Sequence, residues 1–223
     1  MIIPAGGTGT RLNLDIPKQF HSIAGKPIII HTIERIVCSE LIDSIIIACH
    51  RDWIDFLNKE VKKYKLERVE LIIEGGETRQ ESVFNAISLD YLDEFDIVLV
   101  HDAVRMFVDD EIISSVINII EEIGAAVPAI ELIDTIKFVE NEVVDYTPER
   151  KKMRAVQTPQ GARREIIKKA YLECEDILNT LTDDSSIIEK SGFEVGIAKG
   201  KKSNFKITSE IDLEFANYFF GKS

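Results

Sequence analysis

The chain has 223 residues, 45% of them hydrophobic, which is enough to bury the core of one domain. Its formal net charge of -12 at pH 7 excludes a broad nucleic-acid-binding surface, because such surfaces depend on clustered Lys and Arg. No apolar run approaches the length needed to cross a bilayer, and Met1 leads directly into Ile2-Ile3-Pro4 with no basic n-region or cleavage site. We therefore expect a cytoplasmic protein that binds neither nucleic acid nor membranes.

Short strands and longer helices alternate along most of the chain. Met1 to Ile3 is an unusually short first strand, and β-branched runs predict further strands at 44–49, 69–73, 97–100 and 125–129. Segments of helical length and periodicity lie at 27–39, 53–64, 80–92 and 109–123, with Pro27 suited to a first turn and Asp109 or Asp110 to a cap. The alternation predicts a Rossmann-like α/β fold, an open and mostly parallel sheet with helices on both faces. Ligands of such sheets bind beyond the carboxyl ends of the strands.

The alternation stops between about residues 132 and 156. Asn141-Glu142 are flanked by the extended-looking segments 136–138 and 143–145, which predicts a β-hairpin. We expect a single domain over residues 1–223 with this hairpin as an insertion. From the residues alone it is either a plain surface hairpin or an arm with a role in assembly.

The amino-terminal segment Pro4-Ala5-Gly6-Gly7-Thr8-Gly9-Thr10-Arg11, followed by Pro17-Lys18-Gln19, is suited to phosphate binding. Glycines let backbone N–H groups approach phosphate oxygens, and Arg11 and Lys18 can neutralise charge that develops during phosphoryl chemistry. The segment is not a Walker A motif, which needs a second Gly followed by Lys and Ser or Thr. It is not a dinucleotide fingerprint either, because that motif needs a Gly where Leu12 stands. An ordinary glycine turn after a short strand is the alternative.

Further motifs follow in order. Residues 75–83, GGETRQESV, place a glycine turn before a predicted helix, with Thr78 suited to cap it. Residues 101–105, HDAVR, follow a predicted strand, where Asp102 is poorly placed for packing and well placed to hold Mg²⁺ or ribose hydroxyls. The remaining motifs are DTIK at 134–137, QTPQ at 157–160, TDDSSIIE at 182–189 and NFKIT at 204–208. Their cations, together with Arg11 and Lys18, predict the local positive cluster that an acidic protein needs to bind a small polyanion.

Taken together, these motifs resemble those of the cytidylyltransferases that act on polyol phosphates, namely the 2-C-methyl-D-erythritol 4-phosphate enzymes and their ribitol-5-phosphate relatives. The resemblance covers nearly the whole chain. It implies transfer of CMP from CTP to a polyol phosphate, with Mg²⁺ as cofactor, and a homodimer in which the hairpin is an arm that reaches the neighbouring active site. Sugar-phosphate nucleotidyltransferases have a similar start, but their Lys lies further along and their later motifs differ.

The resemblance also implies a role for each site residue. Arg11, Lys18 and Lys206 match the catalytic cations that embrace the triphosphate and the transition state. The nucleotide-binding positions are Ala5, Gly6, Gly7, Thr8, Gly9, Gly76, Glu77, Arg79, Ser82 and Asp102, and Asp102 is also the expected Mg²⁺ ligand. The acceptor-binding positions are Arg105, Thr135 and Arg150. Glu77 stands where relatives usually have Asp.

Nucleotidyl transfer to a phosphate requires no general base. A phosphomonoester has a second pKa of about 6, so the acceptor is already an anionic nucleophile at neutral pH. Stabilisation of the charge on the transferred group dominates such catalysis. The histidines are therefore expected to be structural, and His101 is expected to shape the loop around Asp102.

Two questions stay open at this point. Met106 and Gly161-Ala162 depart from the family pattern, and we expect both to loosen the acceptor side. TDDSSIIE resembles the methylerythritol branch, whereas Val104 and residues 48–53 resemble the ribitol branch. The longer TDDSSIIE match favours methylerythritol 4-phosphate over ribitol 5-phosphate as the acceptor.

A non-catalytic nucleotide-binding regulator on the same fold is the alternative from another functional class. This alternative predicts that a catalytic cation has been lost.

Overall fold

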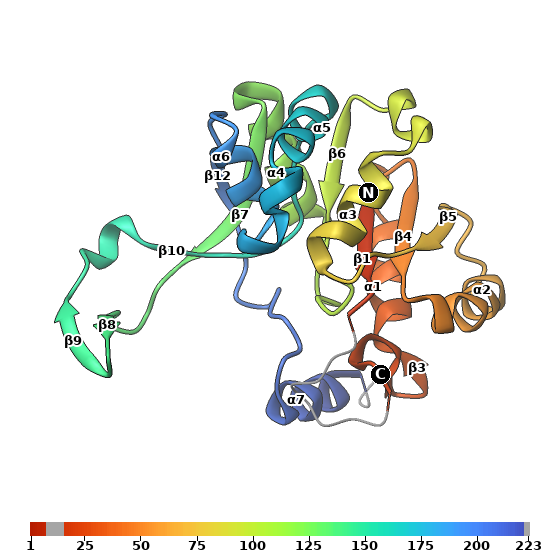
Figure 1. Cartoon of the computed structure of the whole chain (residues 1–223). Coiled ribbons are helices and arrows are strands. Elements are labelled where there is room, and N and C mark those ends of the chain that lie inside the picture. The colour runs from red at the N-terminus through yellow and green to blue at the C-terminus, as the bar shows by residue number, and fades with distance from the viewer. Residues whose placement is uncertain (8–15, 221–223) are drawn as a thin grey trace.

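The computed structural model of the chain describes residues 1–7 and 16–220 (Figure 1). Its strands are β1 (Ile2–Ala5), β2 (Ser22–Ile23), β3 (Lys26–Pro27), β4 (Ile45–Cys49), β5 (Val69–Glu74), β6 (Ile97–Val100), β7 (Ala125–Glu131), β8 (Phe138–Glu140), β9 (Val143–Tyr146), β10 (Arg154–Val156), β11 (Gln160–Arg163) and β12 (Gly196–Lys199). Its α-helices are α1 (Ile28–Val37), α2 (Ile54–Lys63), α3 (Arg79–Ile87), α4 (Asp110–Ile123), α5 (Arg164–Glu173), α6 (Asp184–Lys190) and α7 (Glu210–Phe220).

Eight of the described strands form one mixed, mostly parallel sheet. The order is β10-β7-β11-β6-β1-β4-β5, and β12 pairs with β7. β1 is parallel to β4 and β6, and β4 is parallel to β5. β11 is antiparallel to both β6 and β7 and lies between them. The predicted α/β fold is confirmed, and the short segment Met1 to Ile3 contributes to a central strand.

Helices cover both faces of this sheet (Figure 1). On one face, α1, α2 and α4 pack over Ile3, Ile47 and Leu99, among others. On the other face, α3, α5 and α6 pack over a second cluster that includes Ile2 and Val100. Successive side chains of a strand point to opposite faces, so strands that are buried on both faces need continuous apolar sequence. None of the described helices is long and apolar enough to cross a membrane.

The predicted helix starts agree with the structure, and one predicted helix end does not. Asp109 caps α4 by accepting a hydrogen bond from the backbone N–H of Ile112 at 3.1 Å. Thr78 caps α3 in a reciprocal capping box with Glu81. The helix predicted over 80–92 ends at Ile87 instead, and residues 90–94 form a 3-10 turn. The chain turns because Leu89 adopts an extended backbone conformation.

The two departures from the family pattern lie in packed structure. Met106 is fully buried in a third apolar cluster, where it packs with Ile207 of the NFKIT segment and Leu213 of α7. Gly161 lies in β11, and a Cβ there would sit 2.4 Å from the carbonyl oxygen of Val98. Neither position therefore presents a side chain on an open surface, and their expected effect on the acceptor side stays a prediction.

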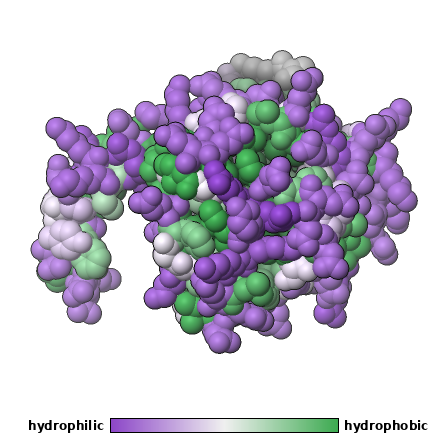
Figure 2. All heavy atoms as spheres, turned by 90° about the horizontal axis from the view of Figure 1, so that it is seen from above, coloured by the Kyte–Doolittle hydropathy of each residue, from purple (hydrophilic) through white to green (hydrophobic). Residues whose placement is uncertain are grey.

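The hairpin around Asn141-Glu142 is present and projects from the body (Figure 1). Both turn residues have positive φ, as a two-residue hairpin turn of type I′ requires. Figure 2 shows hydrophobic residues on this outlying segment. The apolar side chains of its strands are 46–67% exposed: Phe138, Val139, Val143, Val144 and Tyr146. Such a concentration of exposed apolar side chains is typical of an interaction surface.

Candidate functional site

The carboxyl ends of parallel strands bring three of the predicted motifs to one edge of the sheet. β1 leads into Gly6 and Gly7, β5 into Gly75 and Gly76, and β6 into the segment that carries Asp102. Because β6, β1, β4 and β5 are consecutive in the sheet, these segments emerge side by side. The site lies where an open α/β sheet places its ligands.

Two adjoining cavities lie at this edge. One, of about 190 Å³, is lined by Pro4, Ala5, Gly6, Gly7, Lys18, Gln19, Arg79, Asp102, Ala103, Val104 and Lys206. The other, of about 150 Å³, is lined by Arg79, Asp102, Arg105, Val156, Gln157, Thr158, Gln160, Thr182, Asp183 and Lys206. The two share Arg79, Asp102 and Lys206. Motifs that are almost 200 residues apart in the sequence therefore meet in one site.

Gln19 holds the first glycine loop in place. Its buried side-chain amide donates hydrogen bonds to the carbonyl oxygens of Ala5 and Gly7, each at 2.8 Å. The neighbouring Lys18 donates to the carbonyl oxygen of Ile207 at 3.1 Å, which connects it to the NFKIT segment. Sequence reasoning gave Gln19 no role. The sequence does contain a signal for Gln19, because its polar amide stands directly between a candidate catalytic Lys and an apolar Phe.

The second glycine turn is built around Ser82. The buried Ser82 hydroxyl accepts from the backbone N–H of Gly76 at 3.1 Å and donates to the carbonyl oxygen of Thr78 at 2.8 Å. A Cβ on Gly76 would lie 2.3 Å from the Cβ of Glu81, so this position needs glycine. A Cβ on Gly6 would lie 2.8 Å from the Ser82 oxygen, so the two glycine loops abut. Ser82 therefore shapes the turn, and direct contact of Gly76 and Ser82 with cytosine stays a prediction.

Glu77 lies exposed on the same turn, with its backbone N–H donating to the Glu81 carboxylate at 2.8 Å. Its side chain lines neither cavity within the described part of the chain. Its predicted role in nucleotide binding therefore stays a prediction as well.

Asp102 lies at the centre of three cations. Its Oδ1 accepts from Arg79 Nε at 3.1 Å, while Oδ2 lies 2.9 Å from Lys206 Nζ and 3.4 Å from Arg105 Nε. Burial by itself raises the pKa of this carboxyl, but the three cations outweigh burial and hold the pKa well below its usual range. Asp102 is therefore a carboxylate throughout the physiological pH range, and it keeps mutually repelling cations together.

The same contacts bear on the predicted metal site. Both Asp102 oxygens already face cations, which a metal ion would have to displace. Among residues 1–7 and 16–220, no group of three or more His, Cys, Asp or Glu side chains could hold a metal ion. The described residues thus do not fit a metal held by protein ligands alone. The role of Asp102 as an Mg²⁺ ligand stays a prediction.

His101 supports the loop around Asp102, as expected. Its buried ring contacts Thr158 Oγ1 through Nδ1 at 3.0 Å and the carbonyl oxygen of Arg105 through Nε2 at 3.1 Å. The same Thr158 oxygen accepts from the backbone N–H of Asp102 at 3.1 Å. Burial lowers the pKa of His101 to about 4, so the ring is neutral at pH 7.

Not all of the predicted site residues meet in one chain. Thr135 and Arg150 are exposed in the hairpin region, and neither lines the two cavities. Of the three predicted acceptor-binding residues, only Arg105 lies at the site. Thr8, Gly9 and Arg11 fall outside the described residues.

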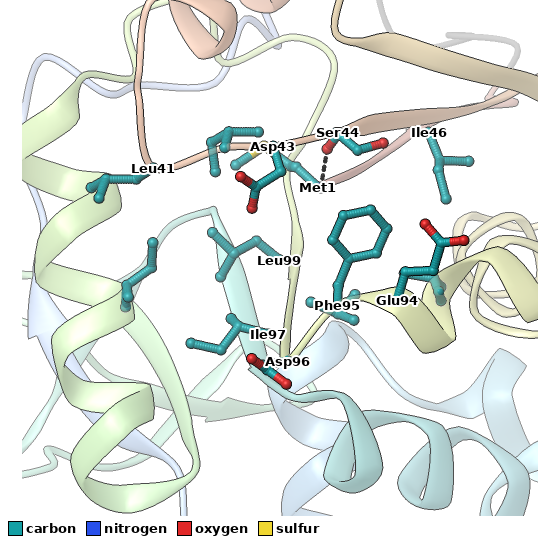
Figure 3. Close-up of a pocket in the computed structure, with 14 residues that line it drawn as sticks. Met1, Leu41, Asp43, Ser44, Ile46, Glu94, Phe95, Asp96, Ile97 and Leu99 are labelled. Atoms are coloured by element: carbon teal, nitrogen blue, oxygen red, sulfur yellow. Dashed lines mark hydrogen bonds between the residues drawn. The ribbon is translucent and has the colours of Figure 1, made fainter.

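A larger cavity, of about 290 Å³, lies at the amino ends of β1, β4 and β6 (Figure 3). There the amine of Met1 donates to the carbonyl oxygen of Ser44 at 2.6 Å. The charged side chains that line this cavity are the carboxylates of Asp43, Glu94 and Asp96, which would repel a polyphosphate. Charge therefore locates the candidate site at the carboxyl edge, although the cavities there are smaller.

Comparison with known proteins identifies the family of the chain. The family model of 2-C-methyl-D-erythritol 4-phosphate cytidylyltransferase (IspD) matches residues 1–222. A protein of that name from Clostridium perfringens is 40% identical over 220 residues, covering 98% of this chain and 96% of its own. Another, from Acidobacterium capsulatum, is 35% identical over 228 residues and covers 98% of this chain and 95% of its own.

Solved structures show the same likeness. The crystal structure of 4-diphosphocytidyl-2C-methyl-D-erythritol synthase from Anaerococcus prevotii has a TM-score of 0.83 at 29% identity, covering 99% of this chain and 96% of that one. The 2-C-methyl-D-erythritol 4-phosphate cytidylyltransferase of Francisella tularensis has a TM-score of 0.81 at 32% identity, covering 97% of each chain. The chain belongs to the 2-C-methyl-D-erythritol 4-phosphate cytidylyltransferase family and is a nucleotidyltransferase.

Proposed function

We propose that this chain transfers CMP from CTP to 2-C-methyl-D-erythritol 4-phosphate in the non-mevalonate synthesis of isoprenoid precursors, releasing pyrophosphate. The observation that carries the proposal is the meeting of Lys18, Arg79 and Lys206 with the first glycine loop around one cavity. This combination offers backbone N–H groups and three cations to a triphosphate in a protein that is otherwise strongly acidic.

In this reaction an oxygen of the acceptor phosphate forms a bond to the α-phosphorus of CTP, and the bond from that phosphorus to pyrophosphate breaks. No histidine lines either of the two cavities among the described residues, and the nearby His101 is buried with contacts on both ring nitrogens. The acceptor needs no general base. Lys18 and Lys206 stabilise the negative charge that develops around the α-phosphorus, and Asp102 fixes the position of Lys206.

Mg²⁺ is the proposed cofactor, with Asp102 as its proposed carboxylate ligand. A bound Mg²⁺ would supply positive charge to the phosphate oxygens, and Mg²⁺ commonly takes most of its ligands from the substrate and water. We expect turnover to stop when the ion is removed with a chelator and to return when Mg²⁺ is added in excess. Unchanged turnover in the chelator would contradict the requirement.

We also propose that the chain forms one nucleotidyltransferase domain with an arm, and that two copies assemble through this arm. Within one chain Arg105 lies at the site, whereas Thr135 and Arg150 lie in the hairpin region away from it. A second copy would bring these residues and the exposed apolar side chains of the hairpin into contact with a partner. The acceptor-binding residues of one site would then come from two chains.

The direct test of enzymatic activity is pyrophosphate release from CTP in the presence of Mg²⁺ and 2-C-methyl-D-erythritol 4-phosphate. We expect release that depends on both substrates. A non-catalytic regulator would instead bind CTP without turnover, which calorimetry on the same sample would detect. That result would overturn the proposal while leaving the family membership intact.

A further inference from the structure

Asp184 is a fully buried carboxylate that holds Arg79 from behind the site. Its two oxygens accept from both terminal nitrogens of the Arg79 guanidinium, at 3.1 Å and 2.7 Å. The buried Tyr171 hydroxyl donates to the same carboxylate at 2.6 Å. Tyr171 belongs to α5 and Asp184 to the first turn of α6, so helices outside the cavity wall fix one end of this arginine.

The remaining guanidinium nitrogen of Arg79 points to the reaction site. Nε donates to Oδ1 of Asp102 at 3.1 Å. A guanidinium is planar, so the paired contact with Asp184 also fixes the direction in which Nε points. Burial by itself lowers the pKa of Arg79, but Asp184 and Asp102 outweigh burial and raise the pKa well above its usual value. The charge of Arg79 is therefore permanent.

The balance of charge explains what Asp184 achieves. Arg79, Arg105 and Lys206 all lie within 3.4 Å of the single carboxylate of Asp102. If Asp184 lost its charge, Asp102 would be the only carboxylate paired with Arg79, and no opposing ion pair would hold Arg79 back from Asp102. Asp102 would then shift toward Arg79 and away from Lys206. Because Asp184 already pairs with Arg79, the second Asp102 oxygen is left to Lys206 and Arg105.

We propose that Asp184, steadied by Tyr171, is a positioning residue for nucleotidyl transfer, acting through Arg79 and Asp102 on the placement of Lys206 and Arg105. The inference rests on the proposed function. It gives a role to the second Asp of TDDSSIIE, which sequence reasoning used only as part of a motif. A buried ion pair that served stability alone would have no specific effect on turnover.

Tyr171→Phe is the mildest test, because it removes one hydroxyl and keeps the packed ring. We expect kcat for CTP turnover to fall by about threefold to tenfold, with a smaller change in KM for CTP. Tyr91→Phe is the matched control, since its hydroxyl also contacts a side-chain oxygen, Ser44 Oγ at 3.0 Å, but far from the site at the amino ends of the strands. The control should keep wild-type kcat. A Tyr171→Phe enzyme with lowered stability and unchanged kcat would overturn the inference.

Asp184→Asn tests the path through Arg79. We expect kcat to fall by about tenfold or more in the wild-type background and by less than about threefold in an Arg79→Lys background, because lysine cannot bridge both carboxylates. Independent, multiplicative losses would overturn the inference. If Asp184→Asn does not fold, the same comparison is made with Tyr171→Phe. An inactive wild-type chain would overturn the proposed function and this inference together, whereas an active wild type with unaffected variants would overturn the inference alone.

Discussion

The cluster around Asp102 shows how an acidic protein can present a positive site. Arg79, Arg105 and Lys206 carry three positive charges against the two negative charges of Asp102 and Asp184, which leaves the cluster at +1. The chain as a whole carries -12. The carboxylates hold the cations at short distances from one another, so the proposed triphosphate ligand would meet a preorganised group of donors.

Lys18→Ala should lower kcat far more than it raises KM for CTP. The reason is that its contact strengthens as charge builds on the α-phosphate, so its main contribution is to the transition state. We expect a fall in kcat of about 100-fold or more, measured by steady-state pyrophosphate release. Lys63→Ala is the control. It alters an exposed lysine that pairs with Glu60 on α2 and should leave both kcat and KM unchanged. An effect confined to KM would contradict the role of Lys18.

Because His101 is buried and neutral, we expect the folded chain to lose stability in mild acid. Burial lowers the pKa of His101 from 6.5 to about 4, so between these values the unfolded chain binds a proton that the folded chain does not. The free energy of unfolding should therefore decrease as the pH falls from 6.5 to 4, by up to about 1.4 kcal/mol per pH unit from this residue. Urea unfolding at pH 7 and pH 5 should show a smaller decrease for His101→Asn than for the wild type. Equal decreases would contradict the assignment of this effect to His101.

At the scale of elements, the strands and helix starts that could be predicted are those that depend on local sequence patterns. The buried strands β4 and β6 and the capped start of α4 follow from apolar runs and an Asp cap that any sequence reader can see. Strand β11 was not predicted because Gln160–Arg163 contains no β-branched residue, and its pairing with β6 and β7 determines its conformation. For the same reason the motifs indicated the edge of the sheet but not the Asp184–Arg79 contact, which joins residues 105 positions apart.

Gly161→Ala should destabilise the chain because β11 leaves no room for a side chain at this position. The added Cβ would lie 2.4 Å from the carbonyl oxygen of Val98 and 2.5 Å from Leu99 Cδ2. We expect the free energy of unfolding to fall by about 1–3 kcal/mol in urea titrations. Gly7→Ala is the control, since a Cβ there would meet nothing within 4 Å. Equal stability of the two variants would show that β11 can shift to accept the methyl group.

At the scale of the whole molecule, the proposed dimer has a site that one chain leaves incomplete. The sequence predicted the hairpin because its turn and strands are local features. It could not predict where Thr135 and Arg150 act, because in the proposed dimer that depends on a second molecule. The exposed side chains of β8 and β9 are the physical reason to expect such a partner.

Shared sites predict that two inactive variants can complement each other. Lys18→Ala damages the body of the site and Arg150→Ala damages the arm, so a mixed dimer would contain one site with neither change. We expect the co-expressed pair to show turnover that neither variant shows alone. Val143→Asp, placed on the exposed face of the hairpin, should yield monomers with weak activity and unchanged unfolding. A fully active monomer, or no recovery on mixing, would contradict the shared site.

Acceptor specificity is the sharpest test of cytidylyl transfer to 2-C-methyl-D-erythritol 4-phosphate. The quantity to measure is kcat/KM for 2-C-methyl-D-erythritol 4-phosphate and for ribitol 5-phosphate at saturating CTP and Mg²⁺. Pyrophosphate release is the readout. Both acceptors present one phosphate, so hydroxyls and a branch methyl worth about 1–3 kcal/mol must distinguish them. We expect a higher kcat/KM for 2-C-methyl-D-erythritol 4-phosphate, with some turnover of ribitol 5-phosphate. A preference of about tenfold or more for ribitol 5-phosphate would contradict this expectation.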